Sequence, residues 1–284
     1  MVLYIFTTHK DLSLPLLLSG AKDVEVETKV IYFSHLHLED NQIFVNHQLL
    51  KVGLKDKILI RWPWDAVNLM DFNYWVKILF IRFAKNIVLD KNVLSTLSPF
   101  YEDKLFQSQI FDVLKIPTPM TYFFQNKHHF QENKVSYPLV VKKRISSRSK
   151  GNFLVGSSDD VFTKTKNRIN KFIFQKKIDF KTDIRINILN QKIIGAVTRK
   201  PSIRGNNRLS VKVDKLFRIE NPQIIKDCLK LSEYLGADFL GVDVILTQSG
   251  KYYFLEANLS PQFNRFKEIS GIDLGRLVIE AAIK

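Results

Sequence analysis

The chain has 284 residues, 45% of them hydrophobic, which is enough to bury a large core and excludes a disordered tail. Lysine and arginine number 43 against 28 acidic residues, so the formal net charge of +15 favours anionic partners, although a lysine-rich genomic bias would explain the excess equally well. The single cysteine, Cys228, excludes an intramolecular disulfide, and the N-terminus lacks the pattern of a signal peptide, so we expect a soluble cytoplasmic protein without a membrane span.

Short apolar runs rich in β-forming residues recur through the first hundred residues and predict the strands of a small α/β lobe. They lie at 2–6, 30–33, 58–62 and 87–89. The segment 65–85 has apolar residues at helical spacing, with Asp65 as its expected N-cap. His35, His37 and Glu39 alternate but have no fourth ligand nearby, so we expect a surface strand there rather than a metal site.

After residue 100 the sequence alternates between predicted helices and strands. An amphipathic helix begins in YEDKLFQSQIFDVL and ends before the Pro117 and Pro119 pair. Strands are predicted in TYFFQN, YPLVVKK, FLVG and KFIFQKKI, and in a hairpin formed by DIRINIL and KIIGAVTR around Asn190-Gln191. A helix follows from Asn221 to about Leu235, and DLGRLVIEAAIK closes the chain as another helix.

A second predicted hairpin, in the segment FLGVDVILTQSGKYYFLEANLSP at 239–261, carries the most informative polar residues. Its two strands flank the turn Thr247-Gln248-Ser249-Gly250. Asp243 lies inside an apolar run, where an unpaired charge is costly, and a period of two places Glu256 and Asn258 on one face of the next strand. The pattern favours a magnesium site, although Asp243 could instead cap a turn or pair with a lysine, and the other two could simply close the strand.

At these residues the chain resembles the ATP-grasp carboxylate–amine ligases, and within them the RimK-like branch. The motifs that carry the resemblance are GVDVI at 241–245, EANLSP at 256–261, SGIDL at 270–274 and DIRINIL at 183–189, and the similarity covers about the last two thirds of the chain. The resemblance implies an α/β and α+β ATP-grasp fold, in which a pre-ATP-grasp lobe precedes two subdomains that clamp ATP. The expected boundaries are 1–100 for the lobe, 101–178 for the first subdomain and 179–284 for the second.

The resemblance also implies which residues bind the nucleotide. Lys142, at the end of an apolar strand, and Lys104 correspond to lysines that contact ATP phosphates in RimK-like enzymes, although either could be a solvated side chain. The loop 146–151, with Ser149 and Gly151, corresponds to a phosphate flap but has one glycine where the family has more, so a plain surface loop stays an alternative.

The remaining implied positions are polar residues of the hinge and of the following strands. The hinge that reads adenine through its main chain corresponds to Gln175, Lys176, Lys177 and Ile178, and the family often has glutamate where Lys176 stands. Asp183 corresponds to a nucleotide-side position, and Arg199, Arg204 and Asn206 correspond to a segment near the γ-phosphate. Arg185 corresponds to a residue that faces the transferred phosphate or the substrate carboxylate, a task that suits the guanidinium fork.

The resemblance implies an ATP- and magnesium-dependent ligation. A carboxylate attacks the γ-phosphate, and an amine then attacks the acyl phosphate, with Arg185, Arg204 and Asn206 as the catalytic residues. We expect Asp243, Glu256 and Asn258 to bind two magnesium ions, with manganese as a substitute, and one substrate to be a peptide or protein of acidic character. Amino-acid addition and macrocyclisation of a precursor peptide through ester or amide links both stay open, as does a homo-oligomeric state.

A function of a different class, a non-catalytic module that binds nucleic acid or an acidic protein, is the alternative. Its support is the net charge of +15 and the aromatic residues Trp62, Trp64, Tyr74 and Trp75, which could stack on bases. Because these aromatics lie in apolar segments suited to core packing, and all three expected metal ligands are present, the sequence favours the ligase and makes nucleic acid a less suitable partner.

Overall fold

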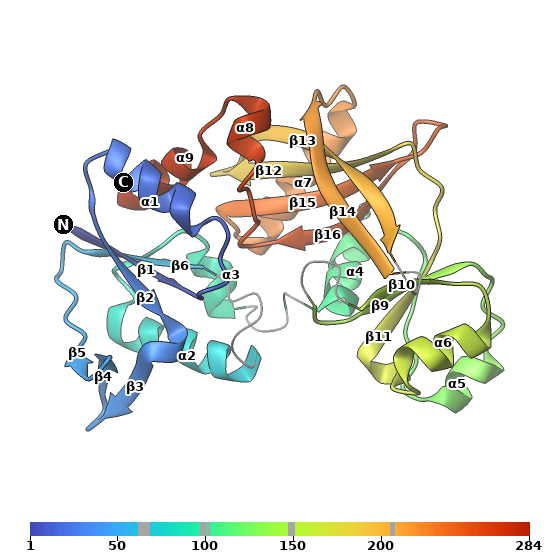
Figure 1. The fold of residues 1–284 in the computed structure, drawn as a ribbon, viewed down its shortest axis with the longest axis horizontal. Helices are drawn as coiled ribbons and strands as arrows, with labels where there is room; N and C mark the ends of the chain where they lie inside the picture. Colours follow the sequence, from blue (N-terminus) through green and yellow to red (C-terminus); the bar gives the residue numbers. More distant parts are fainter. Residues whose placement is uncertain (62–68, 97–100, 102, 147–150, 205–207) are drawn as a thin grey trace.

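The computed structural model describes residues 1–61, 69–96, 101, 103–146, 151–204 and 208–284, with the side chains of 69, 70, 201–204 and 208–212 left aside. It has three parts, which Figure 1 shows as an N-terminal lobe, a small β-rich subdomain and a larger subdomain built on long antiparallel strands. Throughout the part of the chain that is described, no helix combines the length and the apolar character that crossing a membrane requires.

The N-terminal lobe is built on a four-stranded parallel sheet with the order β2-β1-β6-β7. Its strands are β1 (Val2–Thr7), β2 (Glu27–Tyr32), β6 (Lys57–Ile60) and β7 (Ile87–Val88). The four apolar runs of the sequence therefore form strands as predicted. Because β1 lies between β2 and β6, the winding of the chain reverses at β1, and the carboxyl ends of β1 and β6 lie at a topological switch point.

Helices cover this sheet, and a smaller sheet extends from it. The helices are α1 (Leu14–Asp23), α2 (Leu69–Phe83) and α3 (Lys91–Thr96). The predicted helix over 65–85 is confirmed as α2, while its expected cap, Asp65, lies outside the described residues. The turn η1 (Phe33–His35) leads into the small sheet of β3 (Leu36–Glu39), β4 (Gln42–Val45) and β5 (Gln48–Leu49).

The aromatic residues suggested for base stacking are only partly in view. Trp75 packs partly buried against the main core, as the apolar pattern predicts, whereas Tyr74 is 57% exposed and lies outside that core. Trp62 and Trp64 lie outside the described residues.

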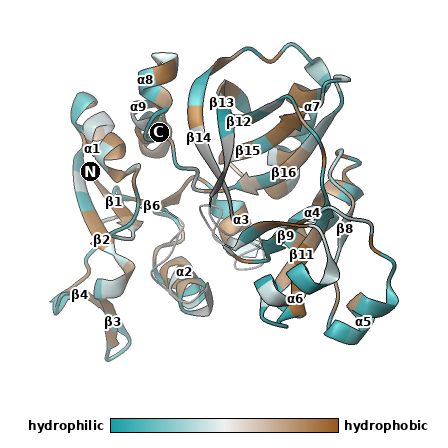
Figure 2. Cartoon of the chain, turned by 45° about the vertical axis from the view of Figure 1, so that its right-hand side comes forward, coloured by the Kyte–Doolittle hydropathy of each residue, from teal (hydrophilic) through white to brown (hydrophobic). Residues whose placement is uncertain are grey.

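One nine-stranded sheet, of order β16-β15-β12-β13-β14-β10-β9-β11-β8, runs through the rest of the chain. Its smaller half contains β8 (Thr121–Tyr122), β9 (Leu139–Lys143), β10 (Asn152–Val155) and β11 (Phe172–Lys176). Phe124, Phe130 and Phe174 lie at the centre of the core between these strands and the helices α5 (Lys127–Glu132) and α6 (Ser158–Thr165), which are followed by η3 (Ile169–Lys171). In Figure 2 much of the ribbon of α5 and α6 has the teal colour of hydrophilic residues.

The larger half contains the two predicted hairpins. Its strands are β12 (Thr182–Leu189), β13 (Lys192–Arg204), β14 (Arg208–Phe217), β15 (Phe239–Leu246) and β16 (Tyr252–Asn258). Sequence reasoning ended the first hairpin near Arg199 and missed β14, which pairs with β13 and meets β10 through Phe153 and Arg208. This single pairing joins the two halves of the sheet.

Helices complete the larger subdomain. They are α4 (Lys104–Val113), α7 (Pro222–Leu235), α8 (Phe266–Ser270) and α9 (Leu274–Ile283). The predicted cap of α7 is confirmed, because the Asn221 side chain accepts a hydrogen bond of 2.9 Å from the Gln223 amide. The last helix, α9, returns to the N-terminal lobe and lies against α1 (Figure 1), where a Cβ on Gly275 would lie 2.4 Å from the Leu16 carbonyl oxygen. Glycine therefore permits this close helix crossing.

Candidate active site

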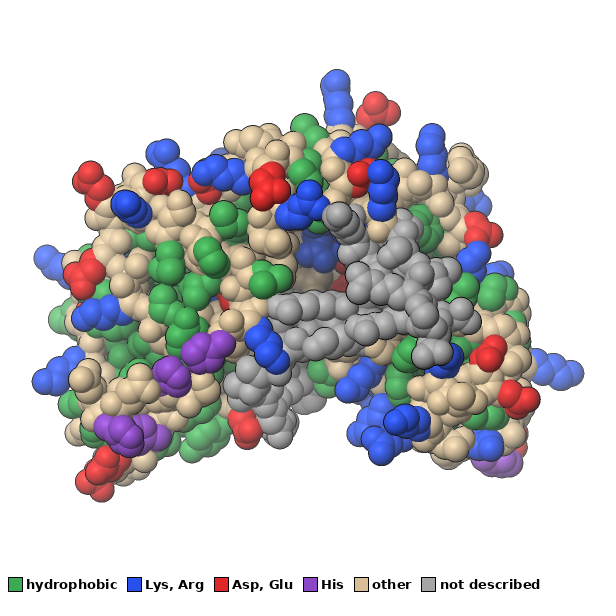
Figure 3. Space-filling view, in the orientation of Figure 1, with side chains coloured by type: hydrophobic (Ala, Val, Ile, Leu, Met, Phe, Trp, Pro, Cys, Tyr) green, Lys and Arg blue, Asp and Glu red, His purple; other side chains and the backbone are tan. Residues whose placement is uncertain are grey.

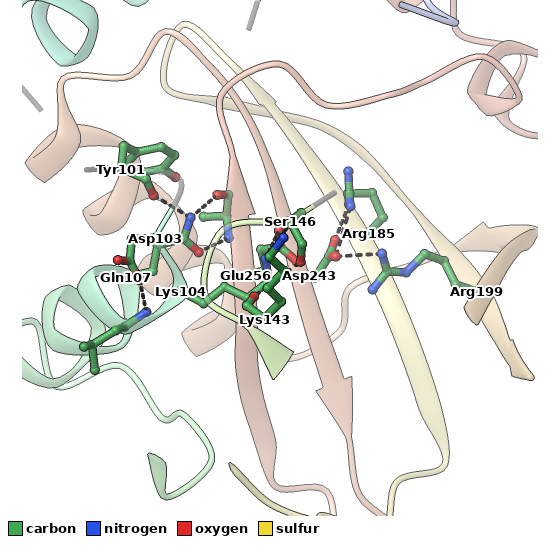
Figure 4. Close-up of polar contacts among 12 residues, drawn as sticks. Tyr101, Asp103, Lys104, Gln107, Lys143, Ser146, Arg185, Arg199, Asp243 and Glu256 are labelled. Atoms are coloured by element: carbon green, nitrogen blue, oxygen red, sulfur yellow. Dashed lines mark hydrogen bonds and ion pairs between the residues drawn. The ribbon is translucent and has the colours of Figure 1, made fainter. Parts of the chain in front are cut away.

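Charged side chains from α4, β12, β13, β15 and β16 converge on one face of the large sheet (Figure 4). In the strand register, Arg185 of β12 lies opposite Asp243 of β15, and Asp243 lies opposite Glu256 of β16. Asn258 follows two residues after Glu256 and lies opposite Gly241, so it shares the same face. The three residues predicted to bind metal therefore lie on two paired strands.

Two arginines face Asp243. Arg185 Nη2 donates to Asp243 Oδ2 at 3.0 Å and Arg185 Nε donates to Oδ1, while Arg199 Nη1 donates to Oδ2 at 2.7 Å. Burial alone would raise the pKa of Asp243, but Arg185 and Arg199 hold this pKa below its usual range. Asp243 is therefore an ionised carboxylate, and its partners are arginines rather than a lysine.

Arg199 also holds the predicted nucleotide-side residue Asp183. Arg199 Nε donates to Asp183 Oδ1 at 2.8 Å, and the two residues are directly opposite in the β12 and β13 register. Burial raises the pKa of Asp183, and the nearby Asp243 charge adds to this effect against the attraction of Arg199. One guanidinium thus links the carboxylates of β12 and β15.

Lys104, the first residue of α4, connects the strand β16 with the polar loop after β9. Its Nζ lies 3.5 Å from Glu256 Oε1 and donates to the Ser146 carbonyl at 2.9 Å. The side chain of Asp103 caps α4 by accepting from the Leu105 amide at 2.9 Å, and it also accepts from Arg144 Nε at 2.9 Å. These contacts fix the helix start from which Lys104 reaches Glu256.

Lys142 lies on β9, across the site from β15 and β16. Burial lowers the pKa of Lys142 to about 8, Glu256 opposes that shift, and the nearby Lys104 charge reinforces it. The pKa of Lys142 therefore responds to the charge of Lys104 and to those of Glu256, Asp243 and Asp183. The structure brings it together with Lys104 and Glu256, as a phosphate-binding role requires.

Gln107 is a site residue that sequence reasoning missed. Its Nε2 donates to the Ala257 carbonyl at 2.8 Å and to the Tyr101 carbonyl at 2.9 Å, and its Oε1 accepts from the Ala257 amide at 3.1 Å. The side chain therefore fixes the backbone between Glu256 and Asn258. The available signal was a polar residue on the buried face of an amphipathic helix.

The predicted hinge residues end β11 and follow it. Gln175 is buried and donates to Thr121 Oγ1 at 2.9 Å. The amide of Lys176 donates to the Met120 carbonyl at 3.0 Å, and the amide of Lys177 donates to the Pro138 carbonyl at 3.3 Å. These two amides are therefore hydrogen-bonded within the protein.

Several residues predicted to bind the nucleotide or to be catalytic lie outside the described residues or next to them. Ser149, Asn206 and the side chain of Arg204 lie outside it. Gly151 is described, and its carbonyl accepts from the Lys143 amide at 3.1 Å, next to Lys142. A pocket of about 940 Å³ opens beside Asp183 and Arg199, and its lining continues through β14 toward the start of α7.

The donor set suits a magnesium ion. Asp243 is ionised, the Glu256 side chain is 22% exposed, and Asn258 is buried with an amide Nδ2 that has no hydrogen-bond partner among the described residues. Two carboxylates and one amide supply oxygen ligands, which hard cations prefer. Within the described ranges, no three or more His, Cys, Asp or Glu side chains form a group that could hold a metal ion. His35, His37 and Glu39 are among the residues that do not form such a group.

Part of the chain is similar in sequence to characterised proteins. The chain is 25% identical over 182 residues to N-acetylaspartylglutamate synthase A of Mus musculus, covering 59% of this chain and 47% of that protein. It therefore spans about half the length of that relative.

Solved structures resemble the whole chain. The ATP-grasp ligase PsnB, complexed with a phosphomimetic variant of a minimal precursor, Mg and ADP, has a TM-score of 0.72 at 15% identity, over 99% of this chain and 97% of that one. The macrocyclase MdnC of Microcystis aeruginosa MRC, bound to the precursor peptide MdnA, has a TM-score of 0.68 at 17% identity, over 100% and 99%. The predicted ATP-grasp fold is therefore confirmed. Residues 101–282 match the model of the RimK-like ATP-grasp domain, and the chain belongs to that family.

Proposed function

We propose that this protein is an ATP- and magnesium-dependent ligase that joins a carboxylate to an amine and forms ADP and phosphate. The observation that carries the proposal is the row of Arg185, Asp243 and Glu256 across three paired strands, with Lys104 beside Glu256. Two neighbouring carboxylates with a cationic side chain at each end can bind both a triphosphate and the cation that accompanies it. Membership of the RimK-like ATP-grasp family supports the same chemistry.

Asp243, Glu256 and Asn258 would hold the magnesium, whose positive charge would offset the negative charge of the phosphates. We expect two ions, with manganese as a substitute, and the Mg and ADP in the PsnB complex support this cofactor class. Lys104 and Lys142 would bind phosphate oxygens through their ammonium groups. Gly151 and Ser149 would bind phosphates from the loop above β9, and Gln175, Lys176, Lys177 and Ile178 would surround the adenine.

Arg185 is the residue we propose to act on the reacting groups. Asp243 holds its guanidinium in a bidentate pair, so its orientation is set before substrate binds. In the first step, a substrate carboxylate oxygen bonds to the γ-phosphorus while the bond to ADP breaks. In the second, the amine nitrogen bonds to the acyl carbon, phosphate leaves with the bonding electrons, and the amine proton passes to solvent. Arg185, with Arg204 and Asn206, would stabilise the oxyanion in that step.

The substrate proposed is a peptide or protein of acidic character. PsnB and MdnC are solved with precursor peptides, and N-acetylaspartylglutamate synthase A is named for an acidic product. Figure 3 shows lysine and arginine side chains spread over the visible face, in keeping with the net charge of +15. Amino-acid addition is our first proposal and macrocyclisation of a precursor our second, in a cytoplasmic protein that could form a homo-oligomer.

The direct test is to incubate the protein with ATP, magnesium, candidate acidic peptides and the twenty amino acids, and to follow both nucleotide products and peptide mass. Amino-acid addition predicts ADP, phosphate and a mass gain of one amino-acid residue. Macrocyclisation predicts ADP, phosphate and the loss of one water from the peptide without any added amino acid. Formation of AMP and pyrophosphate would show that the acyl-phosphate route is wrong.

A further inference from the structure

The N-terminal lobe forms hydrogen bonds to the segment that follows β16, the strand that carries Glu256 and Asn258. Three consecutive residues after β16 bond to residues that lie at or just beyond the carboxyl ends of β1 and β6. Arg61 Nη2 donates to the Pro261 carbonyl at 3.3 Å, Gln262 Nε2 donates to Asp11 Oδ1 at 3.2 Å, and the Phe263 amide donates to Ser13 Oγ at 3.0 Å. This segment begins three residues after Asn258, so the lobe holds the chain directly beyond the proposed metal ligands.

At the centre of this contact is a buried ion pair between Arg61 and Asp11. Arg61 Nε donates to Asp11 Oδ2 at 3.0 Å, and the side chains are 2% and 1% exposed. Thr7 Oγ1 and the Ser13 amide each donate to the same carboxylate at 3.0 Å. A carboxylate with this many donors is fixed in position, and it fixes the arginine that reaches Pro261.

Pro261 transmits this contact to the catalytic side of the sheet. A Cβ placed on Gly241 would lie 2.5 Å from Pro261 Cβ and 3.2 Å from Arg185 Nη1. The proline ring therefore rests on the backbone of β15 next to the guanidinium that pairs with Asp243. Only glycine at 241 leaves room for the proline ring, which would clash with any side chain there.

We infer that Arg61 and Asp11 are positioning residues for the metal site: they fix Pro261, and through it Asn258 and the Arg185 guanidinium. This inference deepens the proposed function and rests on it. Neither residue contacts the proposed metal or phosphate ligands, so their effect passes through the segment 258–263. Residues that orient metal ligands in this indirect way commonly alter metal affinity by about 10- to 100-fold.

The test measures Mn²⁺ binding by electron paramagnetic resonance in the presence of AMPPNP, which needs no knowledge of the peptide substrate. Arg61→Met and Asp11→Asn should weaken Mn²⁺ affinity roughly tenfold. Arg61→Lys keeps the charge beside Asp11 but loses the fork that reaches Pro261, so it should restore part of the affinity. AMPPNP affinity without metal should stay within about twofold of wild type, because the hydrogen bonds and ion pairs of Arg61 and Asp11 do not involve Lys104 or Lys142.

Asp56 provides a matched control in the same lobe. It accepts from the Val2 and Gly53 amides, both at 2.8 Å, at the opposite end of the parallel sheet. Asp56→Ala should therefore weaken the lobe without changing Mn²⁺ affinity. If Arg61→Met does not fold, as judged by circular dichroism, Gln262→Ala replaces it, because that change removes one hydrogen bond to Asp11 and leaves the ion pair intact.

Three outcomes would overturn the inference. Folded Arg61 and Gln262 variants with wild-type Mn²⁺ affinity would show that the segment is positioned without the lobe, and an equal loss in Asp56→Ala would reduce the effect to general destabilisation. If wild-type protein with AMPPNP binds no Mn²⁺, the proposed function itself fails, and the inference falls with it.

Discussion

Asp243 stays ionised because two guanidinium groups face it, and this charge makes it a suitable cation ligand. Arg185 and Arg199 together offset the cost of burying the carboxylate. Arg199 shares its remaining donors with Asp183, so the three strands form one charged unit. We expect a bound cation to take over part of this neutralisation, which would free guanidinium donors for phosphate oxygens.

Lys142 gives the site a pH dependence. Because burial lowers the pKa of its ammonium to about 8, the positive charge that would attract phosphate is present below this pH and is lost above it. AMPPNP affinity measured by calorimetry should therefore fall as pH rises through about 8. Lys142→Arg should abolish this fall, because guanidinium stays charged, whereas a wild-type affinity that does not change between pH 7 and 9 would contradict a phosphate contact by Lys142.

Glu256 should matter for turnover but little for folding. Its side chain is 22% exposed and its charged neighbour, Lys104, lies 3.5 Å away, so Glu256→Gln keeps the shape and removes one ligand charge. ADP release in the presence of substrate should fall by at least roughly tenfold, while the melting temperature changes little. Glu268→Gln is the matched control, because the Glu268 side chain on α8 is exposed, and unaltered turnover in Glu256→Gln would remove Glu256 from the metal site.

At the scale of elements, the N-terminal lobe has a second contact with the large subdomain, in addition to that of Arg61 and Asp11. In this contact, Asp90 and Asp238 each accept a hydrogen bond from the backbone amide of the other. Asp90, after β7, accepts from the Asp238 and Phe239 amides at 2.8 and 2.9 Å, and its own amide donates to Asp238 Oδ2 at 2.7 Å. This contact orients the start of β15, whose later residues reach the site. The N-terminal lobe therefore contacts the hairpin of β15 and β16 at two places. One is the start of β15, and the other is the segment that follows β16.

The burial of Asp90 makes this junction sensitive to pH. Burial raises the pKa of Asp90 to about 8 from an ordinary 3.8, against the two amide hydrogen bonds that lower it. A raised pKa in the folded state contributes stability that is full below about pH 4 and is lost as pH rises through about 8. The free energy of unfolding of wild type, compared with Asp90→Asn in urea, should therefore decrease from pH 5 to pH 8.5. Parallel pH profiles for the two proteins would contradict this account.

At the scale of the whole molecule, the sequence was sufficient to predict those strands and helices whose apolar and polar residues follow a clear period or whose ends carry a capping residue. The hairpin of β15 and β16 was predicted from two alternating segments that flank the turn Thr247-Gln248-Ser249-Gly250, and the helix α7 was predicted from Asn221 and the proline that follows it. The strand β14 was missed although its main partner, β13, directly precedes it in the sequence, and the helix α1 was missed because LPLLLSG has no polar face.

The candidate site was predictable where one strand pattern places two ligands on one face, as with Glu256 and Asn258. The contacts made by Gln107 and Arg61 could not be predicted, because each joins residues far apart in the sequence, with Ala257 and Pro261 as partners. Such contacts depend on how the lobes pack, which no local pattern encodes. The boundaries at residues 100 and 178 stay predictions, since the large sheet is continuous across the second of them.

The central claim is that Asp243, Glu256 and Asn258 together hold the ion that accompanies a triphosphate. A crystal structure of the protein with AMPPNP and magnesium tests it most directly. The account predicts an ion with oxygen ligands from all three side chains and from the phosphates, with Lys142 against the phosphate oxygens. An ordered nucleotide whose ion lies away from these three side chains would contradict it.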